Sequence, residues 1–173
     1  KDNAFARYQL GKLFCQGKLV QKDIARGLPL LEELAEAGVT SAAYIAGKVY
    51  IKEDGWKDVQ RAIRCFHMAA EDGNSYAEYQ LGKIYYFGNG IRADREKGLE
   101  YLNRSAAHGN MYAENLLQVI QQQHIRGAAS LIAQLGRIFK EKEQRQGRVR
   151  HQQPDRKQHR QIDEKKQAMG IRD

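Results

Sequence analysis

Histidine and cysteine are the residue types in this chain best suited to bind a metal ion or to act as nucleophiles. No two histidines stand at HxxxH or HExxH spacing, and neither cysteine has a CxxC partner. On a helix, a cysteine and a histidine two residues apart point to nearly opposite sides, so Cys65 and His67 do not form a ligand pair. We therefore predict no metal site and no cofactor. The residues considered are Cys15, Cys65, His67, His108, His124, His151 and His159.

Catalytic motifs are also missing from the sequence. It contains no nucleophile elbow, no phosphate-binding Walker loop and no dinucleotide glycine fingerprint. The glycines of G-N-G-I, at 88–91, are explained by a turn. We predict that this chain has no catalytic residues and is not an enzyme. Because it begins at Lys1, within a segment that already resembles part of a repeat, we expect a fragment of a longer protein that could carry a catalytic domain upstream.

Composition restricts the compartment and the partners. No run of even 15 apolar residues occurs, which excludes a membrane-spanning helix, and no signal-peptide pattern is present. Two cysteines 50 positions apart argue against a disulfide framework and favour a reducing compartment. We therefore expect a cytoplasmic protein without a membrane partner. The few prolines and the lack of alternating β-branched runs favour an all-α fold.

An internal repeat organises the chain. Similar strings begin at Phe5, Ser41, Tyr76 and Tyr112, at steps of 36, 35 and 36 residues. A second set of strings opens at three aspartates one step apart, and a glycine ends each unit. These positions are Asp23, Asp58 and Asp94, followed by Gly38, Gly73 and Gly109.

Each unit is predicted to form two antiparallel helices. Small and large apolar residues recur at four-residue spacing in the first helix, which places them on one stripe. Gly11, Gly47 and Gly82 lie inside that helix, where glycine costs about 1 kcal/mol relative to alanine. We infer that the partner helix approaches too closely to leave room for a Cβ atom. The aspartates are good N-caps for the second helix, and the final glycines suit left-handed C-caps.

The stretch A-E-Y-Q-L-G-K-I-Y-Y-F-G-N-G-I-R-A-D-R-E-K-G-L-E-Y-L-N-R-S-A-A-H-G, at 77–109, resembles the Sel-one-like repeat. This relative of the tetratricopeptide repeat is an αα-hairpin that stacks into a solenoid. Residues 4–109 hold three such units, and a partial fourth follows from about Asn110 to Gln123. The resemblance implies a right-handed αα-hairpin solenoid over residues 1–125.

The pattern changes after the repeats. Five apolar residues between Leu131 and Phe139 predict an amphipathic helix over 126–146 that caps the open end of the solenoid. Residues 140–173 carry 11 Lys and Arg against 6 Asp and Glu. Residues 1–139 carry 18 Lys and Arg against 15 Asp and Glu, so most of the excess positive charge lies in the C-terminal part. We expect residues 147–173 to be a basic, Gln- and Arg-rich tail that is disordered or forms a polar helix, with at most weak, nonspecific nucleic-acid contact.

A second resemblance concerns the same C-terminal region. L-I-A-Q-L-G-R-I-F-K-E, at 131–141, and D-R-K-Q-H-R-Q-I-D-E-K-K-Q-A-M-G, at 155–170, are similar to the C-terminal region of MobP/MobL-type relaxases of Gram-positive mobile elements. The resemblance implies an alternative function. The chain would then be the accessory region of a plasmid-mobilisation relaxase, with the tail assisting DNA contact.

The first helices are expected to line a concave binding face, by analogy with the tetratricopeptide groove. Tyrosines and lysines recur there four residues apart and could bind an acidic or extended peptide of a partner protein. Two interpretations stay open, since the tyrosines could serve only in packing and the lysines could be merely solvated. The predicted function is a non-catalytic protein-interaction scaffold. The predicted partner-binding residues are Tyr8, Lys12, Tyr44, Lys48, Tyr79, Lys83 and Tyr86.

Overall fold

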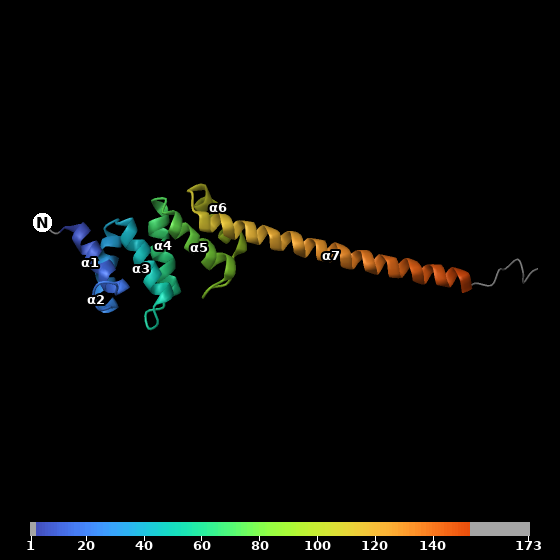
Figure 1. The fold of residues 1–173 in the computed structure, drawn as a ribbon, viewed down its shortest axis with the longest axis horizontal. Helices are drawn as coiled ribbons and strands as arrows, with labels where there is room; N and C mark the ends of the chain where they lie inside the picture. The colour runs from blue at the N-terminus through green and yellow to red at the C-terminus, as the bar shows by residue number, and fades with distance from the viewer. Residues whose placement is uncertain (1–2, 153–173) are drawn as a thin grey trace, which may run out of the picture. The chain divides into compact units, whose positions relative to one another are not determined.

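The computed structural model describes residues 3–152 and contains seven helices and no strand in this range. Side chains are described as far as Lys142, and also at Gln144. The chain divides into two compact units after Gln121. Figure 1 shows α1 to α6 following one another as three helical hairpins. The fold is therefore all-α and built from helical hairpins, as predicted. The helices are α1 (Ala4–Gln16), α2 (Ile24–Glu36), α3 (Thr40–Lys52), α4 (Val59–Glu71), α5 (Ser75–Phe87), α6 (Arg95–Ala107) and α7 (Met111–Gln152).

The predicted caps delimit the second helix of each hairpin. The side chains of Asp23, Asp58 and Asp94 accept hydrogen bonds from backbone N–H groups in the first turns of α2, α4 and α6. These bonds satisfy donors that a helix start leaves unpaired. After each second helix the chain turns at a glycine with a φ of 75–84°, a left-handed conformation that favours this residue. The predicted N-caps and closing glycines are confirmed.

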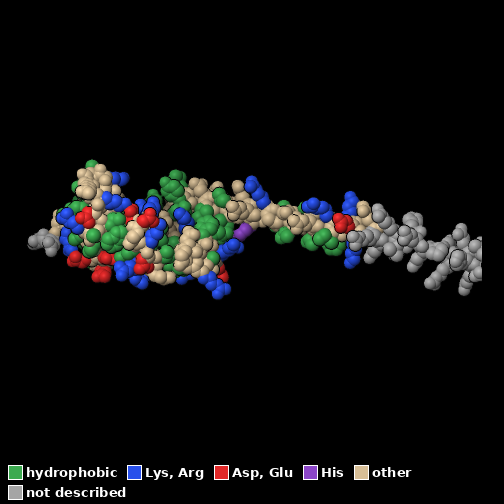
Figure 2. Space-filling view, turned by 90° about the horizontal axis from the view of Figure 1, so that it is seen from below, with side chains coloured by type: hydrophobic (Ala, Val, Ile, Leu, Met, Phe, Trp, Pro, Cys, Tyr) green, Lys and Arg blue, Asp and Glu red, His purple; other side chains and the backbone are tan. Residues whose placement is uncertain are grey.

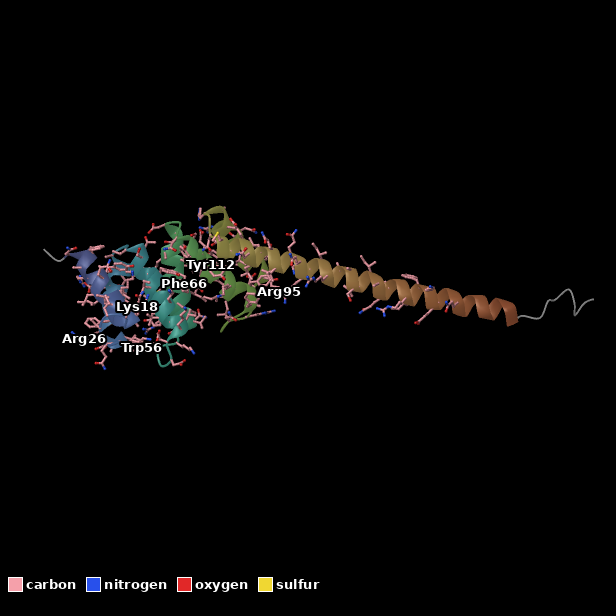
Figure 3. The ribbon with its side chains drawn as sticks, viewed as in Figure 1. Lys18, Arg26, Trp56, Phe66, Arg95 and Tyr112 are labelled. Atoms are coloured by element: carbon pink, nitrogen blue, oxygen red, sulfur yellow. The ribbon has the colours of Figure 1, made fainter. Side chains whose placement is uncertain are left out.

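Glycines in the first helices allow close helix pairing. A Cβ atom placed on Gly47 would lie 2.6 Å from the ring of Phe66, and one on Gly11 would lie 3.0 Å from Cγ of Leu31. Phe66 is fully buried and labelled in Figure 3. The prediction that these glycines face the partner helix is confirmed, and packing explains their place inside helices.

The start of α7 completes the core of the third hairpin. Ala113 and Ile120 are buried with Leu102 and Tyr86 in one apolar cluster. A second cluster joins α1 to α5. The predicted partial fourth repeat therefore supplies one helix, which covers apolar side chains that α5 and α6 would otherwise expose.

One helix occupies the region where the sequence analysis predicts two. The expected first helix of the fourth repeat, ending near Gln123, and the expected separate helix over 126–146 are parts of α7. Proline is the residue that most strongly interrupts a helix, and none occurs between Met111 and Gln152. The glycines at 127 and 136 are exposed and cost too little to end the helix.

In the second compact unit, which begins at Gln122, the described side chains of residues 122–142 are all exposed, including Leu131 and Phe139. Whether this segment caps the solenoid stays a prediction. Of the tail predicted over 147–173, residues 147–152 are helical and residues 153–173 lie outside the described residues. Within the part of the chain that the structure describes, no helix is both long and apolar enough to cross a membrane.

Candidate functional site

Three tyrosine–lysine pairs recur on the first helices of the hairpins. Each lysine follows its tyrosine by one helical turn, so both side chains lie on the same helix face. The Nζ atoms of Lys12, Lys48 and Lys83 lie 5.8, 5.4 and 5.2 Å from the ring centroids of their tyrosines, which is within cation–π range. The tyrosines are Tyr8, Tyr44 and Tyr79, and all six side chains are partly exposed. We call this set the tyrosine–lysine row.

Further aromatic side chains connect the row from one repeat to the next. The ring of Tyr44 lies 6.2 Å from that of Tyr76, and the ring of Tyr79 lies 6.1 Å from that of Tyr112. Tyr76 and Tyr112 are 51% and 61% exposed, and Figure 3 labels Tyr112 at the start of α7. These tilted pairs leave aromatic surface available to a partner, and aromatic side chains are common in protein interfaces.

A pocket of about 270 Å³ adjoins the row between α1, the turn that follows it and α3. Its floor contains Cys15, Ile45 and Val49, which are all less than a tenth exposed. Its remaining lining is polar and mostly cationic, and Figure 3 labels one member, Lys18, beside α1. These residues are Gln16, Lys18, Lys22, Lys48, Lys52 and Glu53.

The charges in this pocket act on one another. Burial lowers the pKa of Lys48, and the positive charges of Lys52, Lys18 and Lys12 lower it further. Both effects disfavour the protonated ammonium, the first by desolvation and the second by repulsion between like charges. Lys22 forms an ion pair with Glu53, so one of the four pocket lysines already has a counter-charge.

One predicted partner-binding residue is not on the accessible surface. Tyr86 is 9% exposed and packs edge-on against Phe87, at 5.0 Å between ring centroids. It is the second-last residue of α5, on the face that meets Gly98 of α6. Tyr86 therefore packs inside the third hairpin, and its burial disfavours the predicted contact with a partner.

The structure places further residues beside the row that the sequence pattern did not single out. Tyr76 and Tyr112 open two of the repeated strings, so their 36-residue step could have identified them. Lys18 and Lys22 lie in the turn of the first unit, which differs from the turns of the other units, and no periodic signal marks them. Only the packing of α1 against α3 brings these two lysines near Lys48 and Lys52.

The residues considered first for chemistry take other positions. Among the described residues, no group of three or more His, Cys, Asp and Glu could hold a metal ion. Cys15 and Cys65 are free and buried, and burial raises the pKa of each thiol to about 11. A buried thiol with a raised pKa is a poor nucleophile near neutral pH.

A family model assigns these hairpins. The Sel1 repeat model matches residues 4–39, 40–74 and 75–110, and each match covers one hairpin and the turn that follows it. The chain belongs to the Sel1 repeat family. Proteins with Sel1 repeats are generally non-catalytic scaffolds for protein–protein interaction.

Solved structures of Sel1 repeat proteins resemble this chain. A Sel1 repeat protein from Oxalobacter formigenes is 34% identical over 64% of this chain and 46% of its own length, with a TM-score of 0.57. A protective antigen present in uropathogenic Escherichia coli strains, which displays an SLR fold, is 26% identical over 70% of this chain and 26% of its own, with a TM-score of 0.65. The chain thus spans less than half of either relative.

The remaining comparison and the relaxase alternative add nothing to this assignment. No curated protein matches the chain. The relaxase resemblance of residues 131–141 and 155–170 receives no support from the family model or from the structural relatives. The Sel1 repeats remain the basis for assigning a function.

Proposed function

We propose that this chain is a non-catalytic scaffold that binds a peptide segment of a partner protein on the face formed by α1, α3 and α5. The observation that carries the proposal is the tyrosine–lysine row. It places an aromatic ring and an ammonium group at corresponding points of three successive repeats, all partly exposed. A repeated surface of this kind suits a repeated ligand, such as an extended peptide.

The spacing of the row matches an extended chain. Neighbouring packed helices lie about 10 Å apart, whereas an extended peptide advances about 3.3 Å per residue. One repeat therefore corresponds to roughly three peptide residues. An acidic residue at every third position could approach Lys12, Lys48 and Lys83 in turn, and this attraction would raise the association rate more than the final affinity.

The lysines of the row are available for a partner. Among the described residues, no carboxylate lies within ion-pair distance of Lys12, Lys48 or Lys83, whereas Lys22, Lys57 and several arginines form ion pairs. Packing alone accounts for part of the role of the tyrosines, since Tyr44 and Tyr79 contact the next aromatic ring. It does not account for three ammonium groups without a carboxylate partner.

Selection from a random-peptide display library tests this proposal. Peptides selected on the full chain should be enriched in Asp and Glu. They should bind the variant K12E/K48E/K83E at least about tenfold more weakly, because each substitution replaces attraction with repulsion. The matched control is R64E/R92E/R95E, which changes the net charge equally at three exposed sites outside the first helices.

The control variant should retain the affinity of the selected peptides, and circular dichroism should show that both variants are folded. Peptides without acidic enrichment that bind the lysine variant as tightly as the parent chain would exclude the tyrosine–lysine row as the binding face.

A further inference from the structure

The pocket between α1 and α3 has the charge of an anion-binding site. Four lysines line it, and only Glu53 opposes them, through its ion pair with Lys22. Lys18, Lys48 and Lys52 therefore surround the same space without a counter-charge among the pocket residues. Like charges held close together raise the free energy of the unoccupied pocket, and an anion in the pocket would relieve their repulsion.

The floor of the pocket restricts the kind of anion. Cys15, Ile45 and Val49 form an apolar surface beneath the lysines. The volume of about 270 Å³ has room for one acidic side chain and its flanking backbone. An acidic side chain fits both features, since its methylene groups can contact the floor while its carboxylate meets the ammonium groups.

We propose that this pocket anchors a carboxylate group of an acidic partner peptide, held by Lys18, Lys48 and Lys52. The inference rests on the proposed function, because it takes the partner to be a peptide on the first-helix face. It adds two residues that the tyrosine–lysine row lacks, Lys18 and Lys52, and it assigns the anchor to the first two repeats.

The anchor is a feature of one repeat pair and is not repeated along the row. One repeat after Lys52, the corresponding position holds Phe87, which is 51% exposed. A peptide that follows the row would therefore meet concentrated positive charge at α1 and α3, and aromatic surface from Phe87 and Tyr112 near α5 and α7. This asymmetry would give the bound peptide a direction, with its acidic group toward the N-terminal repeats.

Nucleic acid is a less suitable occupant. A phosphate backbone is bound along a continuous basic groove. Acidic and basic side chains are instead interspersed on the face of the repeat unit that Figure 2 shows, and residues 1–139 carry 18 Lys and Arg against 15 Asp and Glu. The local concentration of charge at the pocket suits a single carboxylate better than a chain of phosphates.

Fluorescence anisotropy with the full chain can separate this inference from the proposed function. The probe is a labelled peptide of four glutamates flanked by Gly–Ser, with an amidated C-terminus. The variant K18Q/K52Q removes two pocket lysines outside the row, and K12Q/K83Q removes two row lysines outside the pocket. Both remove the same charge from exposed or partly exposed positions.

We expect K18Q/K52Q to weaken binding of the glutamate probe about tenfold or more and K12Q/K83Q to weaken it less than about threefold. Equal weakening by both variants would overturn the anchor while leaving the peptide-binding row intact. Unchanged binding in both would overturn the anchor, whereas the row is tested separately by K12E/K48E/K83E.

Additional probes identify the source of the anionic group. A Gly–Ser peptide with a free C-terminus tests a chain-terminal carboxylate, and a phosphoserine peptide tests a phosphate. Preference for either, with the same loss in K18Q/K52Q, would overturn the side-chain carboxylate as ligand. Tighter binding of a single-stranded DNA oligonucleotide, lost in K18Q/K52Q, would overturn the peptide assignment.

Nuclear magnetic resonance of the lysine side chains gives an independent measurement. The Lys48 ammonium should titrate at a higher pH when the glutamate probe is bound, because a carboxylate nearby favours the protonated form. An unchanged titration of Lys48 at saturating probe would overturn its role in the anchor.

Discussion

Gly82 of α5 lies so close to Leu102 of α6 that a Cβ atom on the glycine would stand 2.7 Å from the leucine Cγ. The carbonyl oxygen of Gly98 would be 3.1 Å from the added Cβ atom of residue 82. Leu102 is fully buried, so its side chain has no open space into which it could move. The two helices therefore pair at a distance that only a residue without a side chain permits.

Substitution of Gly82 should destabilise the compact unit that contains the three repeats. We expect Gly82→Ala to lower the free energy of unfolding by about 1–3 kcal/mol, because overpacking outweighs the better helix propensity of alanine. Urea unfolding followed by circular dichroism measures the change. Gly127→Ala is the matched control, since nothing lies within 4 Å of the added Cβ atom. Equal or higher stability of the Gly82 variant would contradict the close contact.

Removing the partners of the buried Glu78 carboxylate should cost more stability than replacing Glu78 itself. Its carboxylate is fully buried and accepts a hydrogen bond from His108 Nδ1 at 2.8 Å. Arg104 Nη2 lies 3.0 Å from Oε1, an ion-pair distance, although its N–H direction leaves that oxygen without a hydrogen bond. The two partner side chains are 44% and 47% exposed, so water can solvate them when Glu78 is absent.

Equilibrium unfolding of two variants tests this asymmetry. R104Q/H108Q leaves a carboxylate buried without its ion-pair and hydrogen-bond partners and should cost about 3 kcal/mol or more. E78Q leaves two partly exposed groups and should cost about 1 kcal/mol. A larger loss in E78Q than in the double variant would show that the carboxylate is solvated in the folded protein.

His67 should make the stability sensitive to acid. Its two ring nitrogens lie 3.2 Å from the hydroxyl groups of Tyr85 and Tyr101, so the neutral ring donates one hydrogen bond and accepts the other. Burial lowers the pKa of His67 below its ordinary value of 6.5, and the positive charges of Lys97 and Arg104 lower it further. The negative charge of Glu71 opposes these effects but does not outweigh them. Its stabilising contribution is present above pH 6.5 and is lost as the pH falls through the folded-state pKa.

The variant H67Q should lose this part of the acid sensitivity. We expect the thermal midpoint of the parent chain to fall more than that of H67Q between about pH 7.5 and pH 5, since H67Q lacks only this one titrating side chain. Identical pH profiles would show that protonation of His67 is not coupled to folding.

Two leucines, one buried and one exposed, should differ in their contribution to stability. Leu102 is fully buried and Leu135 in α7 is 53% exposed. We expect Leu102→Ala to cost about 2–5 kcal/mol and Leu135→Ala to change stability by less than about 0.5 kcal/mol, as measured by urea unfolding. A cost of several kcal/mol at Leu135 would instead indicate that this residue packs against apolar surface, as the sequence predicts for a capping helix.

Local chemistry made much of the fold predictable. The aspartates at 23, 58 and 94 and the glycines at 38, 73 and 109 act through backbone groups a few residues away. Their effect therefore follows from residue type and spacing alone. The repeat step then placed the tyrosine–lysine pairs at corresponding positions of α1, α3 and α5, because equal steps along the chain give equal positions in a repeat.

The sequence alone therefore determined the repeat, the helix ends and the register of the row. Tertiary structure decided which side chains are accessible and which distant residues meet. Tyr86 is buried because Gly98 lets α6 approach it, whereas Tyr76, on the same helix, is exposed. Lys18 meets Lys52 only because α1 packs beside α3. Periodicity gives the face of a helix, but burial and charge clustering depend on the distance between helices, which the side chains of both partners set together.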